Sequence, residues 1–567
     1  INNSNGIPGG GPLVQIRGLG AVGAGNQPLY VVDGFPLPST SSERSNPIND
    51  IPPQDIASIT ILKDASATAI YGSRGANGVI MITTHKGQTG KPRIKLNAYT
   101  GIQQIISEEK PNMMNAREFA QFQKERFEDM GLEVPKLYQN PEALGEGTNW
   151  FEEVTRLAPV NEVNLNITGG GDNITSYASV GYMKQDGVVI ATDFERITAR
   201  VNIDAKLGKR FNVGLNLAPS FTWKTRDMTG GNGREHEIGW AVTANPIAPV
   251  YNLDGSYNKM IGDETGTTWN YPNLVQAMKE VEQETKTQRL IASLFGEYEF
   301  MKNLKFKSSF NVDWYGNTYT SFRPSTIGNI NEPPPTIPYS RYNHSSYLNW
   351  ASENILTYEK SIGDHSFTGL LGFTYQTQKN EGGDFTGNDY TSDEIQTMNA
   401  AGRIGGWNSW IDDWALISYL ARATYNYKQK YLLTAAIRWD GSSRFGEDNR
   451  WGTFPSVSAG WRLNEEKFLK NTSWLSELKV RASYGLAGNF DIGNYTYMSQ
   501  ITKANYVLNG ALLGGRRMNS VGNPNLGWER VYEWNVGFDF GILNDRILFL
   551  ADFYKRNTKD LLLDVEI

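Results

Sequence analysis

The sequence contains no cysteine and only four histidines among its 567 residues. The lack of cysteine excludes disulfide bonds, thiolate metal sites and cysteine nucleophiles. The histidines, which show neither an H-E-x-x-H motif nor another metal-ligand spacing, are His85, His236, His344 and His365. The sequence also lacks a G-x-S-x-G motif, and no pair of carboxylates stands out from the many acidic residues. We therefore expect neither an enzyme nor a cofactor.

Long hydrophobic runs and basic clusters are missing as well. No stretch of apolar residues reaches the length of a membrane-spanning helix, and the mean hydropathy is −0.46. The 54 Lys and Arg against 60 Asp and Glu give a net charge of −6, and no basic patch suggests nucleic-acid binding. A membrane β-barrel is compatible with this composition, because only every second residue of its strands faces lipid.

The sequence is rich in residues that favour strands and tight turns, with 58 Gly, 15 Trp, 28 Tyr and 24 Phe. Apolar and polar residues alternate repeatedly: Val163, Leu165 and Ile167 are separated by Asn164 and Asn166. This pattern predicts about fifteen strands between residues 93 and 558, many of them as long as the roughly 9–11 residues of a tilted membrane strand.

The connections between these predicted strands alternate in length. Short connections are predicted at 170–173, 207–210, 301–303, 362–364, 427–430 and 543–545. Long connections are predicted at 107–160, 227–286, 321–345, 379–413, 440–451 and 488–526, with a shorter one at 186–193. Residues 464–476 form a connection of medium length where a short one is expected. Short turns on one side of the membrane and long loops on the other are typical of a membrane barrel, whereas a soluble sandwich need not sort its loops by length.

Two local signals predict helices. Asn115 caps a helix that runs to Phe127, with Glu118 three positions after the cap. Asp64 caps a short helix over residues 65–71, which Gly72 closes in the left-handed conformation.

The run Val79–Thr84 that follows is apolar, as in a strand buried within a mixed sheet. The residues before about position 87 therefore form a small α+β unit. Gly18, Gly20 and Gly23 match a dinucleotide-binding motif, but Gly25, Asn26 and Pro28 break the helix that such a site requires.

Several motifs together carry a resemblance to a known family. They are Ile16-Arg17-Gly18, Pro28–Gly34, Leu62–Ile80, Thr192–Arg196, Phe454–Trp461, Gly522–Glu529 and Phe553–Leu562. With these motifs the sequence closely resembles the SusC/RagA-type TonB-dependent transporters of the bacterial outer membrane. The resemblance implies a mainly β fold, a transmembrane antiparallel β-barrel with a small α+β plug domain in its lumen. Such a barrel has about 22 strands when complete, of which about 15 are expected here.

The resemblance also implies the domain organisation. We expect residues 1–87 to be an N-terminally incomplete plug domain and residues 88–567 a C-terminally incomplete outer-membrane barrel. In this family TonB drives the plug through a segment N-terminal to it, and we expect that segment to be absent from this chain.

The implied activity is import of oligomeric nutrients. Oligosaccharides are the first expectation and oligopeptides the alternative, with a SusD-like surface lipoprotein as partner and no nucleic acid. Two rival hypotheses are a passive or adhesive outer-membrane barrel and a secreted β-rich enzyme that processes glycans.

The resemblance further suggests residues that anchor the plug to the barrel wall, namely Arg17, Lys63, Asp64 and Arg74. The alternative interpretation assigns them to local caps and turns. Many relatives carry Glu at the position of Thr60, so one ion pair between plug and barrel is expected to be missing.

Aromatic residues fall into two groups. Those at strand ends suit the interfacial girdles of a barrel: Tyr427, Tyr431, Trp439, Trp461 and Trp534. Those predicted in long loops either contact a sugar or peptide ligand or pack within their own loops: Trp240, Tyr251, Tyr257, Trp269, Tyr271, Trp407 and Trp410.

Overall fold

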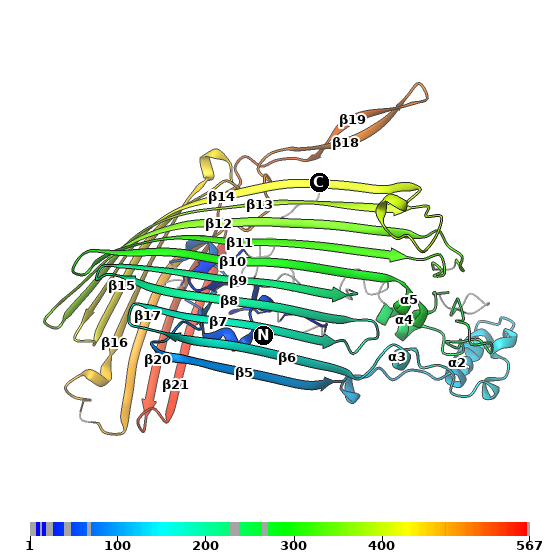
Figure 1. Cartoon of the computed structure of the whole chain (residues 1–567), viewed down its shortest axis with the longest axis horizontal. Helices are drawn as coiled ribbons and strands as arrows, with labels where there is room; N and C mark the ends of the chain where they lie inside the picture. The colour runs from blue at the N-terminus through cyan, green and yellow to red at the C-terminus, as the bar shows by residue number, and fades with distance from the viewer. Residues whose placement is uncertain are drawn as a thin grey trace.

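A computed structural model describes residues 7–11, 14–18, 27–38, 47–64, 68, 70–226, 237–262, 270–330, 332–470 and 472–563. In this part of the chain, no helix has the length and apolar character needed to cross a membrane. A large curved sheet and a small one account for most of the described structure (Figure 1).

The large sheet has fifteen strands among the described residues, and every neighbouring pair is antiparallel. Its order follows the chain, with β5 and β21 at the two edges. The strands are β5 (Gly90–Gln103), β6 (Ala158–Gly170), β7 (Ile174–Asp186), β8 (Asp193–Leu207), β9 (Phe211–Thr225), β10 (Glu282–Met301), β11 (Leu304–Arg323), β12 (Tyr339–Ile362), β13 (His365–Asn388), β14 (Arg403–Tyr427), β15 (Tyr431–Ser442), β16 (Trp451–Arg462), β17 (Leu475–Asn489), β20 (Glu529–Ile542) and β21 (Ile547–Lys559). The predicted mainly β fold and the predicted number of strands are confirmed.

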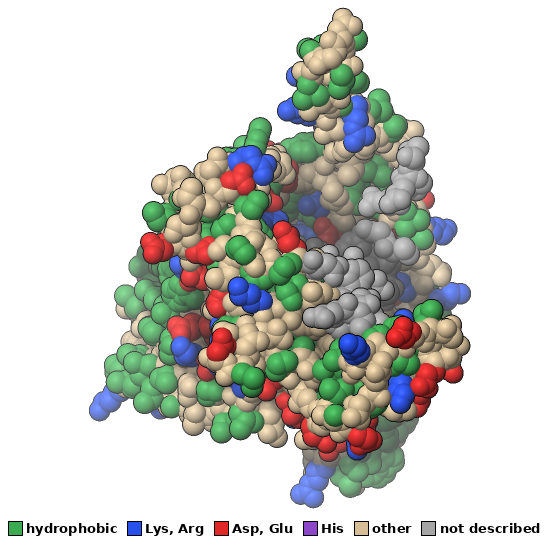
Figure 2. Space-filling model, turned by 90° about the vertical axis from the view of Figure 1, so that its right-hand side faces the viewer, with side chains coloured by type: hydrophobic (Ala, Val, Ile, Leu, Met, Phe, Trp, Pro, Cys, Tyr) green, Lys and Arg blue, Asp and Glu red, His purple; other side chains and the backbone are tan. Residues whose placement is uncertain are grey.

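The large sheet exposes apolar side chains on its outer face and buries polar ones on its inner face. In β11, Phe310 is 50% exposed and Trp314 is 38% exposed, whereas Asn311 and Asp313 between them are buried. Leu371 of β13 repeats the pattern on the outer face. Hydrophobic side chains accordingly gather on the flanks of the molecule (Figure 2). This distribution is the reverse of a soluble protein and suits a wall with lipid outside and a polar lumen inside.

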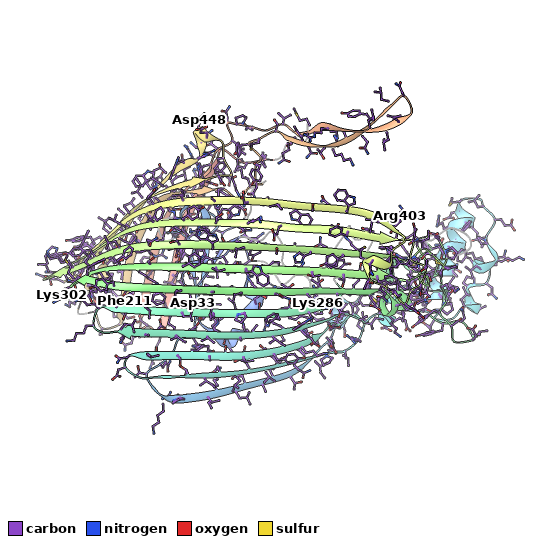
Figure 3. All side chains as sticks on the ribbon, turned by 45° about the horizontal axis from the view of Figure 1, so that its top comes forward. Asp33, Phe211, Lys286, Lys302, Arg403 and Asp448 are labelled. Carbon is purple, nitrogen blue, oxygen red and sulfur yellow. The ribbon has the colours of Figure 1, made fainter. Side chains whose placement is uncertain are left out.

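The two ends of the sheet differ in the length of their connections. Lys302 and Phe211 lie at the end with short turns, and Lys286 and Arg403 lie towards the end with long loops (Figure 3). The predicted alternation of short and long connections is therefore confirmed. Two predicted loops were too long. Most of the loop predicted at 379–413 is strand, because β13 runs to Asn388 and β14 begins at Arg403. The loop predicted at 321–345 also overlaps β12, which begins at Tyr339.

The medium-length connection between β16 and β17 is held closed by Glu466. Its carboxylate accepts hydrogen bonds from Tyr431 Oη at 2.7 Å, Trp461 Nε1 at 3.1 Å and Lys430 Nζ at 3.3 Å. The bond from Tyr431, followed by that from Trp461, lowers the pKa of the Glu466 carboxyl. The rings of Tyr427, Tyr431 and Trp461 also stack in series across β14, β15 and β16. Three of the predicted girdle aromatics therefore lie side by side at this end.

Short helices lie in the loops and in the plug. The α-helices are α2 (Ala116–Asp129), α3 (Trp150–Glu153), α4 (Glu237–Thr243) and α5 (Leu274–Glu280). The 3-10 helices are η2 (Pro47–Asp50), η3 (Pro53–Asp55), η4 (Gly72–Arg74), η5 (Ser107–Glu109), η6 (Lys136–Tyr138), η7 (Pro141–Ala143), η8 (Met398–Ala400), η9 (Glu447–Asn449) and η10 (Leu463–Glu465). The predicted cap of α2 is confirmed, because Asn115 and Glu118 form a reciprocal capping box.

A hairpin that we did not predict projects from the loop between β17 and β20. Its strands are β18 (Gln500–Leu508) and β19 (Ala511–Ser520), and they pair with each other. The turn residues Asn509 and Gly510 both have positive φ, as a tight hairpin turn requires. The hairpin extends away from the large sheet in both views (Figures 1 and 2).

The small sheet has the order β2-β1-β4-β3, with β1 (Leu29–Val32), β2 (Phe35–Pro36), β3 (Ile56–Leu62) and β4 (Val79–Thr84). Strand β4 is parallel to β1 and antiparallel to β3, which confirms the predicted mixed sheet. Most of the helix predicted at 65–71 and of the glycine motif at 18–23 lies outside the described residues. The domain boundary that we propose at residues 87 and 88 falls between β4 and β5.

Candidate functional site

The small sheet lies against the polar inner wall of the large sheet, and four groups of contacts, most of them buried, join the two. The first group centres on Arg200 of β8. Its guanidinium lies 3.5 Å from the Asp33 carboxylate and 3.6 Å from the Asp55 carboxylate. Both aspartates belong to the part of the chain before residue 88 that contains the small sheet, called here the small sheet's unit. Tyr177 of β7 also donates to Asp55 at 2.7 Å. In Figure 3, Asp33 is labelled between Phe211, at the end with short turns, and Lys286.

Asn202 extends this first group along β8. Its amide donates to Thr84 Oγ1 at 3.1 Å and to the His85 carbonyl at 2.7 Å. Thr84 in turn donates its hydroxyl and its main-chain N–H to the Asp33 carboxylate. The end of β4 is thus tied to the wall through both side chains and backbone.

The second group lies at β10 and β11. Arg289 forms a bidentate pair with Asp313, with both N–O distances at 2.8 Å, and its other terminal nitrogen lies 3.1 Å from Asp50 of η2. Tyr347 donates to Asp313 at 3.1 Å. Arg289 and Asp313 are almost completely buried, so each charge depends on its partners for stabilisation.

The third group holds η4 against β15. Arg438 pairs with Asp440 at 2.7 Å and donates to the Ile70 carbonyl, while Asp440 accepts the main-chain N–H of Ser73 at 2.9 Å. Gly72 has φ +54°, and a Cβ atom at this position would overlap Arg438 and Asp440. Glycine is therefore required here for both its conformation and its lack of a side chain.

Arg74 is the last residue of η4, and its side chain reaches the wall at β13 rather than at β15. It donates to Gln376 of β13, which donates to Asn349 of β12 at 2.9 Å. Burial, together with the nearby Arg438 guanidinium, lowers the pKa of Arg74 to about 10. The side chain remains charged at neutral pH, in a place where water screens it poorly.

The fourth group joins the small sheet's unit to β17, β20 and β21. Arg17 lies 2.9 Å from Asp64, contacts Glu533 of β20 and lies over the ring of Tyr554 of β21. Arg481 of β17 lies 3.8 Å from the same Asp64 carboxylate.

Many of the wall's donors bind main-chain atoms of the small sheet's unit. Arg556 of β21 donates to the Ala76 carbonyl at 2.6 Å, and Arg196 of β8 donates to the Asn49 carbonyl. The side chains of Asn202 and Arg438 likewise donate to the main-chain carbonyls of His85 and Ile70, respectively. In these contacts the wall contributes the side chain and the small sheet's unit contributes the backbone.

Three of the four predicted anchors make side-chain contacts within these groups: Arg17, Asp64 and Arg74. Lys63 contributes its main-chain carbonyl, which accepts from Arg17 at 3.2 Å. Thr60 lies in β3 opposite Met81, and its side chain is exposed. Whether these residues anchor the plug in function, and whether Thr60 marks a missing ion pair, stay predictions.

Sequence reasoning missed most of the residues that form the contacts, including Asp33, Asp55, Arg200, Arg289 and Arg438. A signal was available in the strands themselves. Arg196, Arg200 and Asn202 occupy alternate positions of β8, the same periodicity that marks its polar face.

The predicted loop aromatics mostly pack on one another. Trp240 stacks on Tyr271 at 5.2 Å between ring centroids, and Tyr251 stacks on Tyr257 at 5.0 Å. The buried Tyr271 belongs to a hydrophobic cluster between α3 and α5, against which Trp240 and Tyr257 pack. Trp269 lies outside the described residues.

Trp407 and Trp410 were wrongly predicted to lie in a loop, because both are residues of β14. The strands β13 and β14 continue beyond the apolar part of the wall, and there the alternation that marks a membrane strand fades. Trp407 is 74% exposed, whereas Trp410 is half-buried and its ring lies beside Gly382 of β13.

A wall with an apolar outside and a polar lumen, and a small mixed sheet fastened within that lumen, define a plugged β-barrel of the outer-membrane type. Residues 1–79 match the family model for the TonB-dependent receptor plug domain, and residues 222–567 match that for the TonB-dependent receptor-like β-barrel. The chain belongs to the TonB-dependent receptors, a family of outer-membrane transporters, and within it is of the SusC/RagA type.

Individual relatives agree with this assignment. The chain is 34% identical to TonB-dependent receptor P3 of Formosa agariphila, over 99% of this chain and 54% of the relative. It is 32% identical to TonB-dependent receptor SusC of Bacteroides thetaiotaomicron, over 100% of this chain and 57% of the relative. The solved RagAB peptide transporter is similar with a TM-score of 0.85 and 26% identity, over 98% of this chain and 64% of the solved chain. The chain thus spans about half the length of the curated relatives it matches.

Proposed function

We propose that the protein imports oligomeric nutrients across the bacterial outer membrane in a TonB-dependent way, together with a SusD-like surface lipoprotein. The observation that carries the proposal is the set of buried ion pairs between the plug and the barrel wall. A plug held by the ion pairs of Arg200 and Arg289, and by the hydrogen bond from Arg438 to the Ile70 carbonyl, keeps the lumen closed until work is done on it. The anchoring role of Arg17, Asp64 and Arg74 belongs to this proposal.

An external source of energy follows from the same contacts. Each buried pair costs roughly 3–5 kcal/mol to break when one partner is left uncompensated. Binding of one cargo molecule is a small source of free energy beside several such pairs. Coupling to the proton-motive force through TonB is therefore the proposed source of the work.

Oligosaccharides are the first proposed cargo, and the polar lining of the inner wall supports them. The inner wall carries amides at Asn311, Asn349 and Gln376, which are buried while the plug is in place and would suit a hydrated, polar cargo once the plug moves. The loop aromatics contribute little to this choice, because Trp240 and Tyr271 stack on each other.

Oligopeptides are the second candidate cargo, and the similarity to the RagAB peptide transporter favours them. Backbone amides of a peptide would use the same polar wall.

Uptake by intact cells tests the proposal. Cells with and without the gene take up fluorescent oligosaccharides or oligopeptides, each with and without a protonophore. We expect uptake that needs both the gene and the proton-motive force. Uptake that persists with the protonophore, or swelling of liposomes by free sugar flux through the intact protein, would support a passive barrel instead.

A further inference from the structure

A small cavity lies where the plug meets the wall near the long-loop end of the barrel. It has a volume of about 70 Å³ and is lined by plug residues including Arg74 and Asn77 and by wall and loop residues including Gln378, Trp414 and Arg444. This space holds several waters or one small polar group, and it is too small for a whole sugar ring.

Four polar atoms on its lining residues are buried without a hydrogen-bond partner in the described part of the chain: Ser73 Oγ, Arg74 Nε, Gln378 Oε1 and Trp414 Nε1. Two of them, the indole Nε1 of Trp414 and the guanidinium Nε of Arg74, can only donate. The Trp414 side chain is only 5% exposed. A buried donor without an acceptor costs free energy, so a bound group that accepts from both atoms would be stabilised.

The charge of the cavity is positive. Its charged lining residues are Arg74, Arg444 and Asp491, which leaves one positive charge in excess. Arg444 is held between the rings of Trp414 and Phe490, at 5.2 and 5.1 Å from their centroids, and its Nε donates to Asn494 at 2.8 Å. Burial lowers the pKa values of both arginines, so each gains from a nearby negative charge.

We propose that this cavity binds a carboxylate group of the cargo, which accepts hydrogen bonds from Trp414 Nε1 and Arg74 Nε. The inference rests on the proposed function and adds a chemical class to it. A single excess positive charge matches a monoanion, and two donors without acceptors match the two oxygens of a carboxylate. Because Arg74 belongs to the plug and Trp414 to the wall, the bound group would bridge the two.

Such a carboxylate has two sources, a uronic acid in an oligosaccharide or the C-terminus of a peptide. Four probes separate them: trigalacturonate and its methyl ester, and trialanine and its C-terminal amide. Binding to the complete transporter, purified from the outer membrane, is measured by titration calorimetry. We expect one acid to bind about tenfold more tightly than its neutralised counterpart, equal to about 1.4 kcal/mol. The pair that shows the preference identifies the source.

Two tryptophan variants locate the preference. Trp414→Phe keeps the ring and removes the Nε1 donor, so the acid preference should fall to less than about threefold, or below about 0.7 kcal/mol. Trp528→Phe is the matched control, because Trp528 is equally buried in the same aromatic cluster but donates to the Arg450 carbonyl. Arg74→Gln repeats the test from the plug side.

The proposal is overturned if neither acid binds more tightly than its counterpart, or if Trp414→Phe and Trp528→Phe behave alike. Those results would leave the proposed function intact if energised uptake of neutral oligomers persists. Conversely, a clear acid preference without energised uptake would refute the proposed function and keep the carboxylate site.

Discussion

Replacing Asp440 by Asn should loosen the plug more than any exposed change of the same kind. The carboxylate of Asp440 is completely buried, pairs with Arg438 at 2.7 Å and accepts from Ser73 N at 2.9 Å. The variant leaves the Arg438 charge uncompensated, close to the second buried cation Arg74. Loss of one partner from a buried pair costs about 3–5 kcal/mol.

Urea-induced opening of the barrel measures this effect. The complete transporter is placed in planar bilayers, and the urea concentration at which the channel conductance reaches half its maximum is recorded. With an m-value of about 2 kcal/mol/M for a small unit, a loss of 3–5 kcal/mol lowers this midpoint by about 2 M.

Asp384→Asn provides the matched control. Asp384 forms a bidentate pair with Arg341 at 2.9 and 3.1 Å, but the pair is exposed near the rim. Exposed pairs contribute about 0.2–1 kcal/mol, so the midpoint should move by less than about 0.5 M. Equal midpoints for the two variants would refute the role of Asp440 in holding the plug against the barrel wall.

Three further predictions concern other parts of the molecule. Gly72→Ala should destabilise the plug by more than the roughly 1–2 kcal/mol that a left-handed conformation costs a residue with a side chain, because its Cβ also overlaps Arg438. A protease-protection assay of the plug measures this loss, and unchanged protection would contradict it. Replacing Gln500–Ser520 by a short linker should leave the barrel assembled, since β17 pairs directly with β20; loss of the heat-modifiable folded band on a gel would disprove this. The lowered pKa of Glu466 means that its contribution to the closed turn is full above its ordinary pKa of 4.5 and is lost as the pH falls through the lowered value; Trp461 fluorescence should report this loss in the native protein and not in Glu466→Gln.

The parts of the fold that depend on short-range patterns were predictable. The capping box of α2 joins residues three positions apart, and the apolar and polar side chains of β11 alternate along consecutive residues. The hairpin at Asn509-Gly510 was also predictable, because an Asn-Gly pair flanked by apolar residues is a strong hairpin signal. It was missed because that stretch was treated as a single loop.

The contacts between plug and wall were not predictable in the same way. Arg200 meets Asp33 and Asp55 only after the sheet has curved around the plug, and no local pattern records that meeting. Trp407 shows a different limit: a strand that extends beyond the membrane loses the apolar alternation by which strands are recognised.

In several contacts the wall contributes a side-chain donor and the plug contributes a main-chain acceptor, and this limits which mutations can break the contact. Arg196, Asn202 and Arg556 bind carbonyl groups of Asn49, His85 and Ala76, and a carbonyl is present whatever side chain the residue carries. Mutations at those plug positions therefore preserve the acceptor, whereas mutations of the wall donors remove the bond outright. Among homologues, the residue type should accordingly vary more at these plug positions than at the wall positions whose side chains donate to them.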